Sequence, residues 1–256
     1  NLMAIVATNL TTGGDADGNS TASTASITPS ANKLILLTVV SKTAITTDPN
    51  QPTASGNGLT WVVINSVVYD TTSSSRRRVT CLRAMGASPS SGALAIDFGG
   101  QNQTNVDWVI DELSDTDTSG TNGSGAIVQT ALASDGTNTV STITATLAAF
   151  GSTNNATYGS IGAGGNTFTI TAGSGFIIIG DSATTNQLRA STEFRNDNDT
   201  TVDFSMSGNQ EMGLVAIEIK AAAGSLIKSI NGLAYASIKT INGLGIASVK
   251  TKNGLA

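Results

Sequence analysis

Short blocks of apolar and β-branched residues, separated by Gly, Ser, Thr and Asn, run through most of the chain and restrict what it can fold into. Apolar residues do not recur at the three- and four-residue spacing of an amphipathic helix over any window of about a dozen residues before residue 220. The blocks predict about fifteen short strands: Asn1–Leu10, Thr21–Thr28, Lys33–Val40, Leu59–Tyr69, Arg78–Met85, Ala93–Phe98, Val106–Leu113, Ala126–Gln129, Val140–Leu147, Ala156–Ile161, Thr167–Thr171, Phe176–Ile179, Gln187–Phe194, Val202–Met206 and Leu214–Ile219.

Two of these blocks indicate how the strands are buried. Lys33–Val40 is almost continuously aliphatic, which predicts a central strand covered on both faces. Val106–Leu113 alternates, with Val106, Trp108 and Ile110 on one side and Asp107, Val109 and Asp111 on the other. Dense short strands with Gly-rich turns predict an all-β fold, and residues 1–220 are long enough for one double-sheet, jelly-roll-like β-sandwich.

Several residues in the blocks carry more local predictions. Arg76-Arg77-Arg78 precedes an apolar run, so it predicts a strand start or a charged strand edge. The segment Gly86–Gly92 has the length of a hairpin turn between its two flanking strands. Glu218, between Ile217 and Ile219, is expected on the solvent face of its strand.

The remaining residues of interest are uncharged. Cys81 is the only cysteine, which excludes an intrachain disulfide and predicts a small buried side chain. Trp61 and Trp108 lie in apolar strands, so core packing is expected of them before ligand contact.

The C-terminal tail, residues 227–256, repeats one phrase three times at an 11-residue spacing. Each unit carries a Gly and several β-branched residues, which disfavour a helix. Each unit also contains Asn-Gly, which supplies the two positive-φ residues of a tight turn, so a unit is predicted to be two strands of about four residues hinged at that dipeptide. The corresponding positions of the three units are Ile227, Asn231, Gly232 and Leu233, then Ile238, Asn242, Gly243 and Leu244, then Val249, Asn253, Gly254 and Leu255.

Strands this short cannot bury a core alone, so the tail is expected to lie against the main domain or against the tails of other copies. We therefore predict a sandwich domain at 1–220, a small-residue linker at 221–226, and a β-repeat tail at 227–256 that attaches or oligomerises the protein. An 11-residue unit suits three chains that share each layer, which makes a homotrimer the expected oligomer.

Composition excludes several kinds of partner and chemistry. The net charge is −5, which disfavours nucleic acid as a partner, and no apolar run reaches the roughly 20 residues of a membrane span. The motif Gly180-Asp181-Ser182 resembles the nucleophile block of Gly-Asp-Ser esterases, but their mechanism needs a histidine and the chain has none. We therefore expect no enzymatic activity.

Calcium is the one cofactor that the sequence leaves open. Asp15, Asp17 and Asn19 offer oxygen ligands at alternate positions around Gly18, as at the start of a calcium loop, although the acidic closing ligand is missing. Two further acidic loops contain Asp115 with Asp117 and Asp197 with Asp199. Polar turns use the same residues for backbone hydrogen bonds, so a purely structural role stays open for all three loops.

Several segments resemble a group of largely uncharacterised β-sandwich proteins from bacteriophage and environmental genomes. They are Ser55–Trp61, Ser75–Thr80, Arg83–Ser88, Ile96–Gln101 and Asp117–Gln129. The tail is similar to C-terminal repeats of phage-type structural proteins. The resemblance implies a structural component of a virion or other extracellular particle, and no catalytic residues.

The expected function is a non-enzymatic structural protein of a phage particle: a capsid decoration, fibre or tail-associated subunit that forms homo-oligomers and contacts other particle proteins. Two alternatives stay open. One is an extracellular, pilus-like filament subunit joined by β-strand addition. The other is a carbohydrate-binding host-recognition module that stacks exposed aromatic residues on a glycan.

Overall fold

The computed structural model describes residues 4–70, 75–137 and 139–223, together with short strands of the tail at 229–230, 233–234, 240–241 and 244–245. Residues Ala4–Ala222 form one compact unit, and the described tail strands belong to a second. The two units are described separately.

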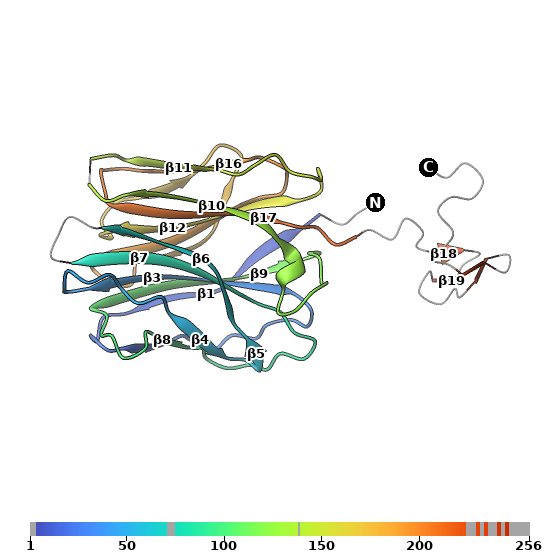
Figure 1. Cartoon of the computed structure of the whole chain (residues 1–256), viewed down its shortest axis with the longest axis horizontal. Coiled ribbons are helices and arrows are strands. Elements are labelled where there is room, and N and C mark those ends of the chain that lie inside the picture. Colours follow the sequence, from blue (N-terminus) through green and yellow to red (C-terminus); the bar gives the residue numbers. More distant parts are fainter. Residues whose placement is uncertain are drawn as a thin grey trace. The chain divides into compact units, whose positions relative to one another are not determined.

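The compact unit is built from antiparallel strands joined by turns, with one 3-10 helix, η1 (Ser124–Ala126), among its described residues (Figure 1). The strands are β1 (Val6–Asp15), β2 (Thr21–Ser23), β3 (Leu34–Thr43), β4 (Thr53–Gly56), β5 (Leu59–Thr60), β6 (Val62–Asp70), β7 (Arg76–Ala84), β8 (Ala95–Asp97), β9 (Asn105–Ser114), β10 (Ile127–Asp135), β11 (Thr142–Thr146), β12 (Ala156–Gly164), β13 (Ile170–Ala172), β14 (Ile177–Ser182), β15 (Leu188–Arg195), β16 (Thr201–Met206) and β17 (Met212–Ile219).

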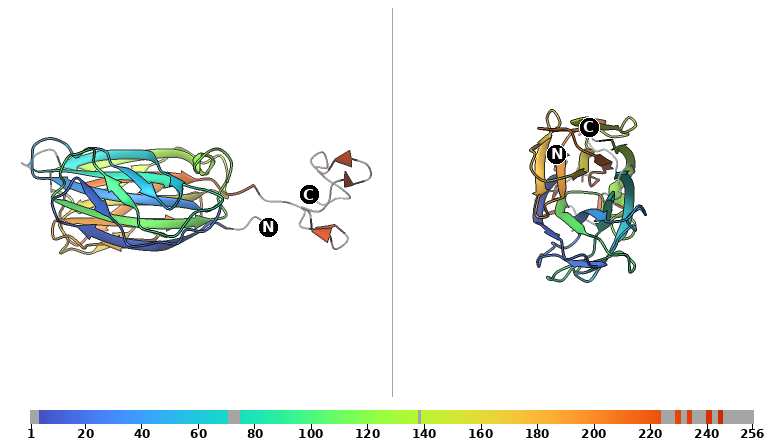
Figure 2. Two further views of the ribbon diagram at one scale, coloured as in Figure 1. Left: turned by 90° about the horizontal axis from the view of Figure 1, so that it is seen from below. Right: turned by 90° about the vertical axis from the view of Figure 1, so that its left-hand side faces the viewer.

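These strands form four sheets stacked as layers, which Figure 2 shows from two further sides. The first inner sheet has the order β1-β9-β3-β7-β6, and the second inner sheet has the order β10-β17-β12-β15-β14. Outside the first lies the sheet β2-β8-β4-β5, and outside the second lies β11-β16-β13. The predicted all-β sandwich is confirmed as a fold class, but the chain builds two sandwiches where one was expected.

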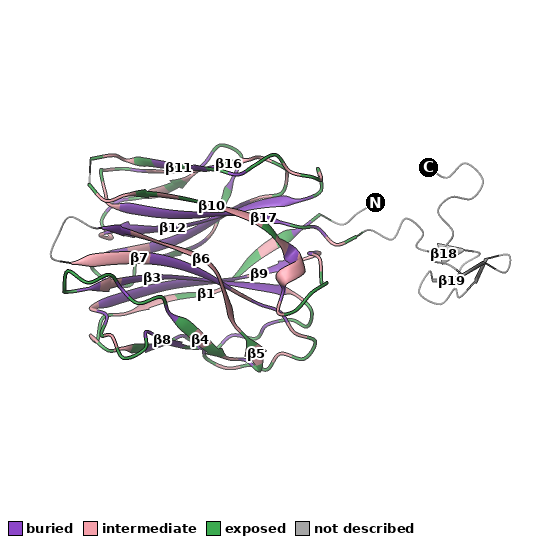
Figure 3. Cartoon of the chain, viewed as in Figure 1, coloured by how far each residue is buried: buried purple, intermediate pink, exposed green. Residues whose placement is uncertain are grey.

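Three hydrophobic cores fill the three spaces between the layers, and the burial pattern follows from them (Figure 3). Inner strands are covered on both faces, so β3 and β17 are buried along almost their whole length. Outer strands face solvent on one side, so β11 alternates between buried Ile143 and Ala145 and exposed threonines.

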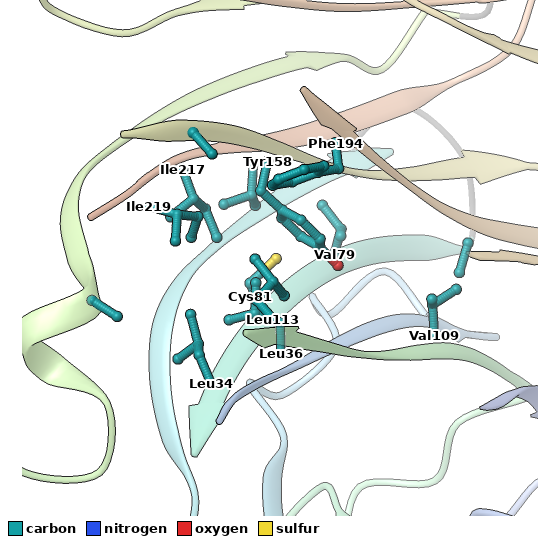
Figure 4. Close-up of a cluster of buried hydrophobic side chains, with 14 of the residues drawn as sticks. Leu34, Leu36, Val79, Cys81, Val109, Leu113, Tyr158, Phe194, Ile217 and Ile219 are labelled. Atoms are coloured by element: carbon teal, nitrogen blue, oxygen red, sulfur yellow. The ribbon is translucent and has the colours of Figure 1, made fainter. Parts of the chain in front are cut away.

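The middle core joins the two inner sheets. Figure 4 shows its side chains entering one space from both of them. The labelled members are Leu34, Leu36, Val79, Cys81, Val109 and Leu113 from the first inner sheet and Tyr158, Phe194, Ile217 and Ile219 from the second. Cys81 is buried, as its surroundings in the sequence predicted.

The two sandwiches have the same topology. In residues 4–114 the first strand lies beside the last, and the last lies beside the third; residues 127–219 repeat that order with β10, β17 and β12. The outer sheets β2-β8-β4 and β11-β16-β13 also correspond strand for strand, with β5 as an addition in the first half. The chain is therefore an internally duplicated pair of jelly-roll-like sandwiches.

Strand register supports the duplication in detail. In the first half Val63 pairs with Leu82 and the next paired residue is Asn65, which leaves Ile64 in a bulge. In the second half Ile178 pairs with Glu193 and the next paired residue is Gly180, which leaves Ile179 in the corresponding bulge. A bulge at the same place in both halves marks a shared backbone design.

The halves pack against each other as equivalent partners. β6 contacts β10 while its counterpart β14 contacts β1, and β3 contacts β15 while its counterpart β12 contacts β7. Thr38 and Ser160 occupy equivalent positions, and their hydroxyls are 2.6 Å apart across the interface. Such mutual contacts are the signature of an isologous, two-fold interface, here within one chain.

Two local predictions are corrected by the structure. Arg76 begins β7, as expected of a strand start, but β7 lies between β3 and β6 and is not an edge. The strands on either side of Gly86–Gly92 do not form a hairpin: β7 stays in the inner sheet while β8 joins the outer one. The backbone crosses between layers here because the buried faces of both strands line the same core.

The region around the predicted boundary at residue 220 is tied into the compact unit. Ala221 forms an isolated bridge with Thr116, and the Ala222 N–H donates to Asp115 O at 2.8 Å.

In the tail, Ser229–Ile230 pairs with Leu233–Ala234, and Thr240–Ile241 pairs with Leu244–Gly245, both antiparallel. These pairs flank the first two Asn-Gly positions, as the turn prediction requires. Ile227, Asn231, Gly232, Ile238, Asn242 and Gly243, and the third unit with Val249, Asn253, Gly254 and Leu255, lie outside the described residues.

Close packing between the inner sheets leads to a first prediction. A Cβ at Gly213 would lie 2.5 Å from Cδ1 of the buried Tyr69, whereas a Cβ at Gly208 would meet nothing within 4 Å. Gly213→Ala should therefore lower the free energy of unfolding by about 1–3 kcal/mol through overpacking. Gly208→Ala is the matched control and should be near neutral in the same denaturant titration. Equal effects of the two substitutions would contradict the packing described here.

Candidate functional site

Five of the acidic side chains of the compact unit lie in its interior. Asp70, Asp107, Asp111, Glu193 and Glu218 are all fully buried. Buried carboxylates are costly unless they are hydrogen-bonded or neutral, so each needs a physical explanation. These residues are the first candidates for a functional site.

Asp111 lies at the centre of a network that joins the two inner sheets. Its Oδ2 accepts hydrogen bonds from Tyr158 Oη and Thr192 Oγ1, both at 2.7 Å, and its Oδ1 accepts one from Asn9 Nδ2 at 2.9 Å. Asp111 and Asn9 belong to the first half of the chain, Tyr158 and Thr192 to the second. Burial raises the pKa of Asp111 and the three donors act against that rise. The arrangement clamps the two halves together.

Glu218 is a correction to the sequence prediction, because it is fully buried and does not face solvent. Its Oε1 accepts from Asn155 Nδ2 at 2.5 Å, and its Oε2 accepts from Gln129 Nε2 at 2.6 Å. The outer strand β11 and its flanking loop cover this face of β17, which alternation along one strand could not reveal. Gln129 in turn exchanges two hydrogen bonds with Ala148, so Glu218 ties together β10, the residue that precedes β12, and this loop.

Asp107 and Glu193 are less well satisfied. Asp107 Oδ1 accepts from the Thr185 N–H at 3.2 Å and Glu193 Oε2 from the Gly173 N–H at 2.9 Å, while the second oxygen of each is buried without a partner. Burial raises the pKa of each to about 8. A pKa near 8 favours the protonated, neutral form of each acid at pH 7.

Charged groups gather at the end of the inner sheets where β7 begins. The Arg77 guanidinium binds the Asp70 carboxylate and lies 3.5 Å from Glu211 Oε2. Lys42 Nζ donates to Gln187 Oε1, and burial together with the nearby Arg77 lowers the pKa of Lys42. Arg77 thus pairs with an acid of each half, and Lys42 is hydrogen-bonded to an amide of the second half, which is a structural use of ionisable groups.

The acidic loops form turns. Asp15 Oδ1 accepts the Asp17 N–H at 2.8 Å, and Asp135, at the equivalent end of β10, accepts the Thr137 N–H at 2.9 Å in the same way. Asp117 and Asp197 accept the N–H two residues on as well. Within the described part of the chain, no three His, Cys, Asp or Glu residues lie together as metal ligands would. Asp15, Asp17 and Asn19 are brought into one turn, and calcium binding there stays a prediction.

The Gly-Asp-Ser motif is part of a strand end. Ser182 is the last residue of β14, and its Oγ donates to Gly13 O at 2.8 Å. Asp181 pairs with Arg189, whose guanidinium also lies over the Phe168 ring. The serine of the motif thus holds β14 against β1, which is a structural role.

Aromatic side chains are directed inward. Trp108 is buried in the core beneath the outer sheet and the half-buried Trp61 packs against the same core, as predicted. The large apolar side chains that are exposed in the described residues are all aliphatic: Val6, Ile45, Val128, Leu132, Ile177 and Ile178. This leaves the described surface poor in groups that could stack on a sugar.

Comparison of the chain with protein-family models, curated proteins and solved structures finds no match. No helix among the described residues is long and apolar enough to cross a membrane. A functional interpretation therefore starts from the chain's own residues: buried carboxylates that hold sheets together, and a repeated tail.

The two fully buried tyrosines provide a matched test of the Asp111 network. Tyr158→Phe removes one of the donors to a buried carboxylate and should lower the free energy of unfolding by about 1–3 kcal/mol. The Tyr69 hydroxyl has no hydrogen-bond partner among the described residues, so Tyr69→Phe should be neutral or stabilising. Chemical denaturation of both variants measures the two changes in the free energy of unfolding. A larger loss of stability for Tyr69→Phe than for Tyr158→Phe would contradict the network.

Asp107 and Glu193 predict how stability depends on pH. Each holds its proton up to about pH 8 in the folded protein, whereas an unfolded carboxylic acid loses it near pH 4. Between these values the folded state binds more protons, so the free energy of unfolding should fall as pH rises, by on the order of 1 kcal/mol per pH unit for each group.

The test compares the wild type with a double variant, Asp107→Asn with Glu193→Gln, by denaturant unfolding from pH 5 to pH 8. The variant should lose most of the downward slope because neither replacement titrates. A wild-type stability that rises over this range, or a slope that the double variant retains, would mean that the two acids are ionised in the folded protein.

Proposed function

We propose that this protein is a non-enzymatic structural subunit of a bacteriophage virion or other extracellular particle, assembled into homo-oligomers through its C-terminal repeats. The observation that carries the proposal is how the ionisable groups are used. The buried carboxylates at Asp70, Asp111 and Glu218 bind groups on neighbouring strands, and Asp107 and Glu193 are held as neutral acids between layers. Such an arrangement stabilises a rigid building block.

The tail supports an assembly role. Its described strand pairs are two residues long, and pairs of that size need a larger surface to be stable. Three repeats in series offer three such surfaces at a regular spacing, which suits identical tails that pack together. The resemblance to phage-type repeats points in the same direction. Capsid decoration, fibre and tail-associated subunit are the particle roles compatible with this proposal.

The filament subunit remains the second candidate, because the inner sheets end in edge strands on which a neighbour's strand could be added. A filament grows by open, head-to-tail contacts, whereas the proposed oligomer is closed. The glycan-binding alternative has less support, since the exposed large apolar side chains of the described residues include no aromatic ring.

The tail can be tested by replacing Gly232, Gly243 and Gly254 together with Val. Val cannot readily adopt the positive φ that the Asn-Gly turns require, so the repeats should fail to form their strand pairs. At low protein concentration, where only the tails associate, sedimentation velocity should show a trimer for the full chain and a monomer for the triple variant, with the β-sandwich thermal transition unchanged.

A matched control places Val at Gly151 and Gly208, where an added Cβ meets nothing within 4 Å. This variant should remain trimeric. The proposal fails if the unmodified full chain stays monomeric at high concentration, or if the triple variant assembles like the wild type.

A further inference from the structure

The two long sides of the double sandwich each expose a pair of strand edges. On one side, β6 ends the first inner sheet and β10 ends the second; on the other, β1 and β14 do the same. We call these the β6/β10 edge and the β1/β14 edge. Because β6 corresponds to β14 and β10 to β1, the two edges are equivalent under the internal two-fold relation.

At each edge the two stacked strands are fastened together. Asn65 Nδ2 on β6 donates to Thr130 Oγ1 on β10 at 2.9 Å, and Ser182 Oγ on β14 donates to Gly13 O on β1 at 2.8 Å. On each side of the molecule, the edge strands of the two inner sheets are therefore stacked one on the other. A partner that fits such an edge has to present two stacked strands, one for each sheet.

The edges carry few of the charges that usually prevent strand edges from associating. Each of the four strands has one charged residue, an Asp at or next to its C-terminal end: Asp70, Asp135, Asp15 and Asp181. The residues before these acids contain no Lys, Arg, Asp or Glu. The chain as a whole carries a net charge of −5, so two copies repel each other except where the contacting surfaces are uncharged.

Aliphatic side chains occupy the same positions in both edges. Val62-Val63-Ile64 begins β6, and the equivalent triplet Ile177-Ile178-Ile179 begins β14. Ile177 is 60% exposed and Ile178 37%, and on the other side Val128 is 49% and Leu132 42% exposed. The third residue of each triplet, Ile64 or Ile179, packs against the middle core, and the equivalents of Ile177 and Ile178 in β6 are partly buried. Each edge nevertheless leaves two large aliphatic side chains at the surface, which favours contact with a partner.

We propose that the β6/β10 and β1/β14 edges are surfaces through which neighbouring copies of this chain join, each edge continuing both inner sheets into those of the next copy. A second copy fits because its own edge offers the required pair of stacked strands, each uncharged along most of its length. A single extended peptide would satisfy only one of the two sheets. This inference rests on the proposed function, since it gives the assembling subunit its lateral contacts.

Lysine substitutions test the surfaces. Ile177→Lys with Ile178→Lys places two charges on one edge, and Val128→Lys with Leu132→Lys places two on the other. Each pair should abolish assemblies larger than the tail-linked oligomer in sedimentation velocity, with the thermal transition retained. Ile45→Lys is the matched control: Ile45 is 51% exposed but lies after β3, away from both edges, and its variant should assemble like the wild type.

Engineered cysteines add a readout that does not depend on loss of assembly. The only natural cysteine, Cys81, is buried, so a single added thiol is the reactive one. A short bis-maleimide should join copies that carry Ile177→Cys or Leu132→Cys at least tenfold more than copies that carry Ile45→Cys.

The outcomes separate the two proposals. If the full chain assembles beyond the tail-linked oligomer, while both lysine pairs assemble equally and cross-linking is no greater at the edges than at position 45, the edges are not the contact and the proposed function survives. If the full chain is monomeric at every concentration, the proposed function fails, and the edge contacts fail with it.

Discussion

The structure depends on the contact between its two inner sheets, and at the centre of that contact on one buried carboxylate. Asp111 receives hydrogen bonds from Asn9, Tyr158 and Thr192, so both halves of the chain contribute to a single site. A carboxylate without these donors would be a large cost in this position. The halves are thus matched to each other in polar geometry as well as in shape, which favours one relative placement of the two sheets.

Comparison of the two halves shows that the Asp111 network has no counterpart at the equivalent positions. Asp111 corresponds to Ile217 and Asp107 to Gly213, so the acids of β9 have apolar or missing side chains at the equivalent positions of β17. Tyr69 fills the space beside Gly213, and Tyr158 reaches Asp111. The two sandwiches make equivalent strand contacts, and pairs of unlike residues make the interface between them specific. Glu112 and Glu218 remain alike at equivalent positions, yet only Glu218 is fully buried.

Much of the fold follows from sequence patterns, because strand formation is signalled locally. The continuous aliphatic run before Ser41 predicts the buried β3, and alternation along β9 separates its two faces correctly. Alternation does not show whether a face is covered, which is why Glu218 was expected in solvent. Its donors, Asn155 and Gln129, lie 63 and 89 residues away in the sequence. Sequence patterns do not reveal the division into two sandwiches for a similar reason: the halves share strand order and bulges but few residues.

The central claim is that this chain is a building block whose chemistry holds it together and whose tail assembles it. The most direct measurement is an electron cryomicroscopy reconstruction of the purified full chain at high concentration. The account predicts closed, rotationally symmetric units in which the tails of several copies meet, with double sandwiches of neighbouring copies in contact along the β6/β10 and β1/β14 edges. Images that contain only monomers, at concentrations well above those in sedimentation experiments, would contradict it.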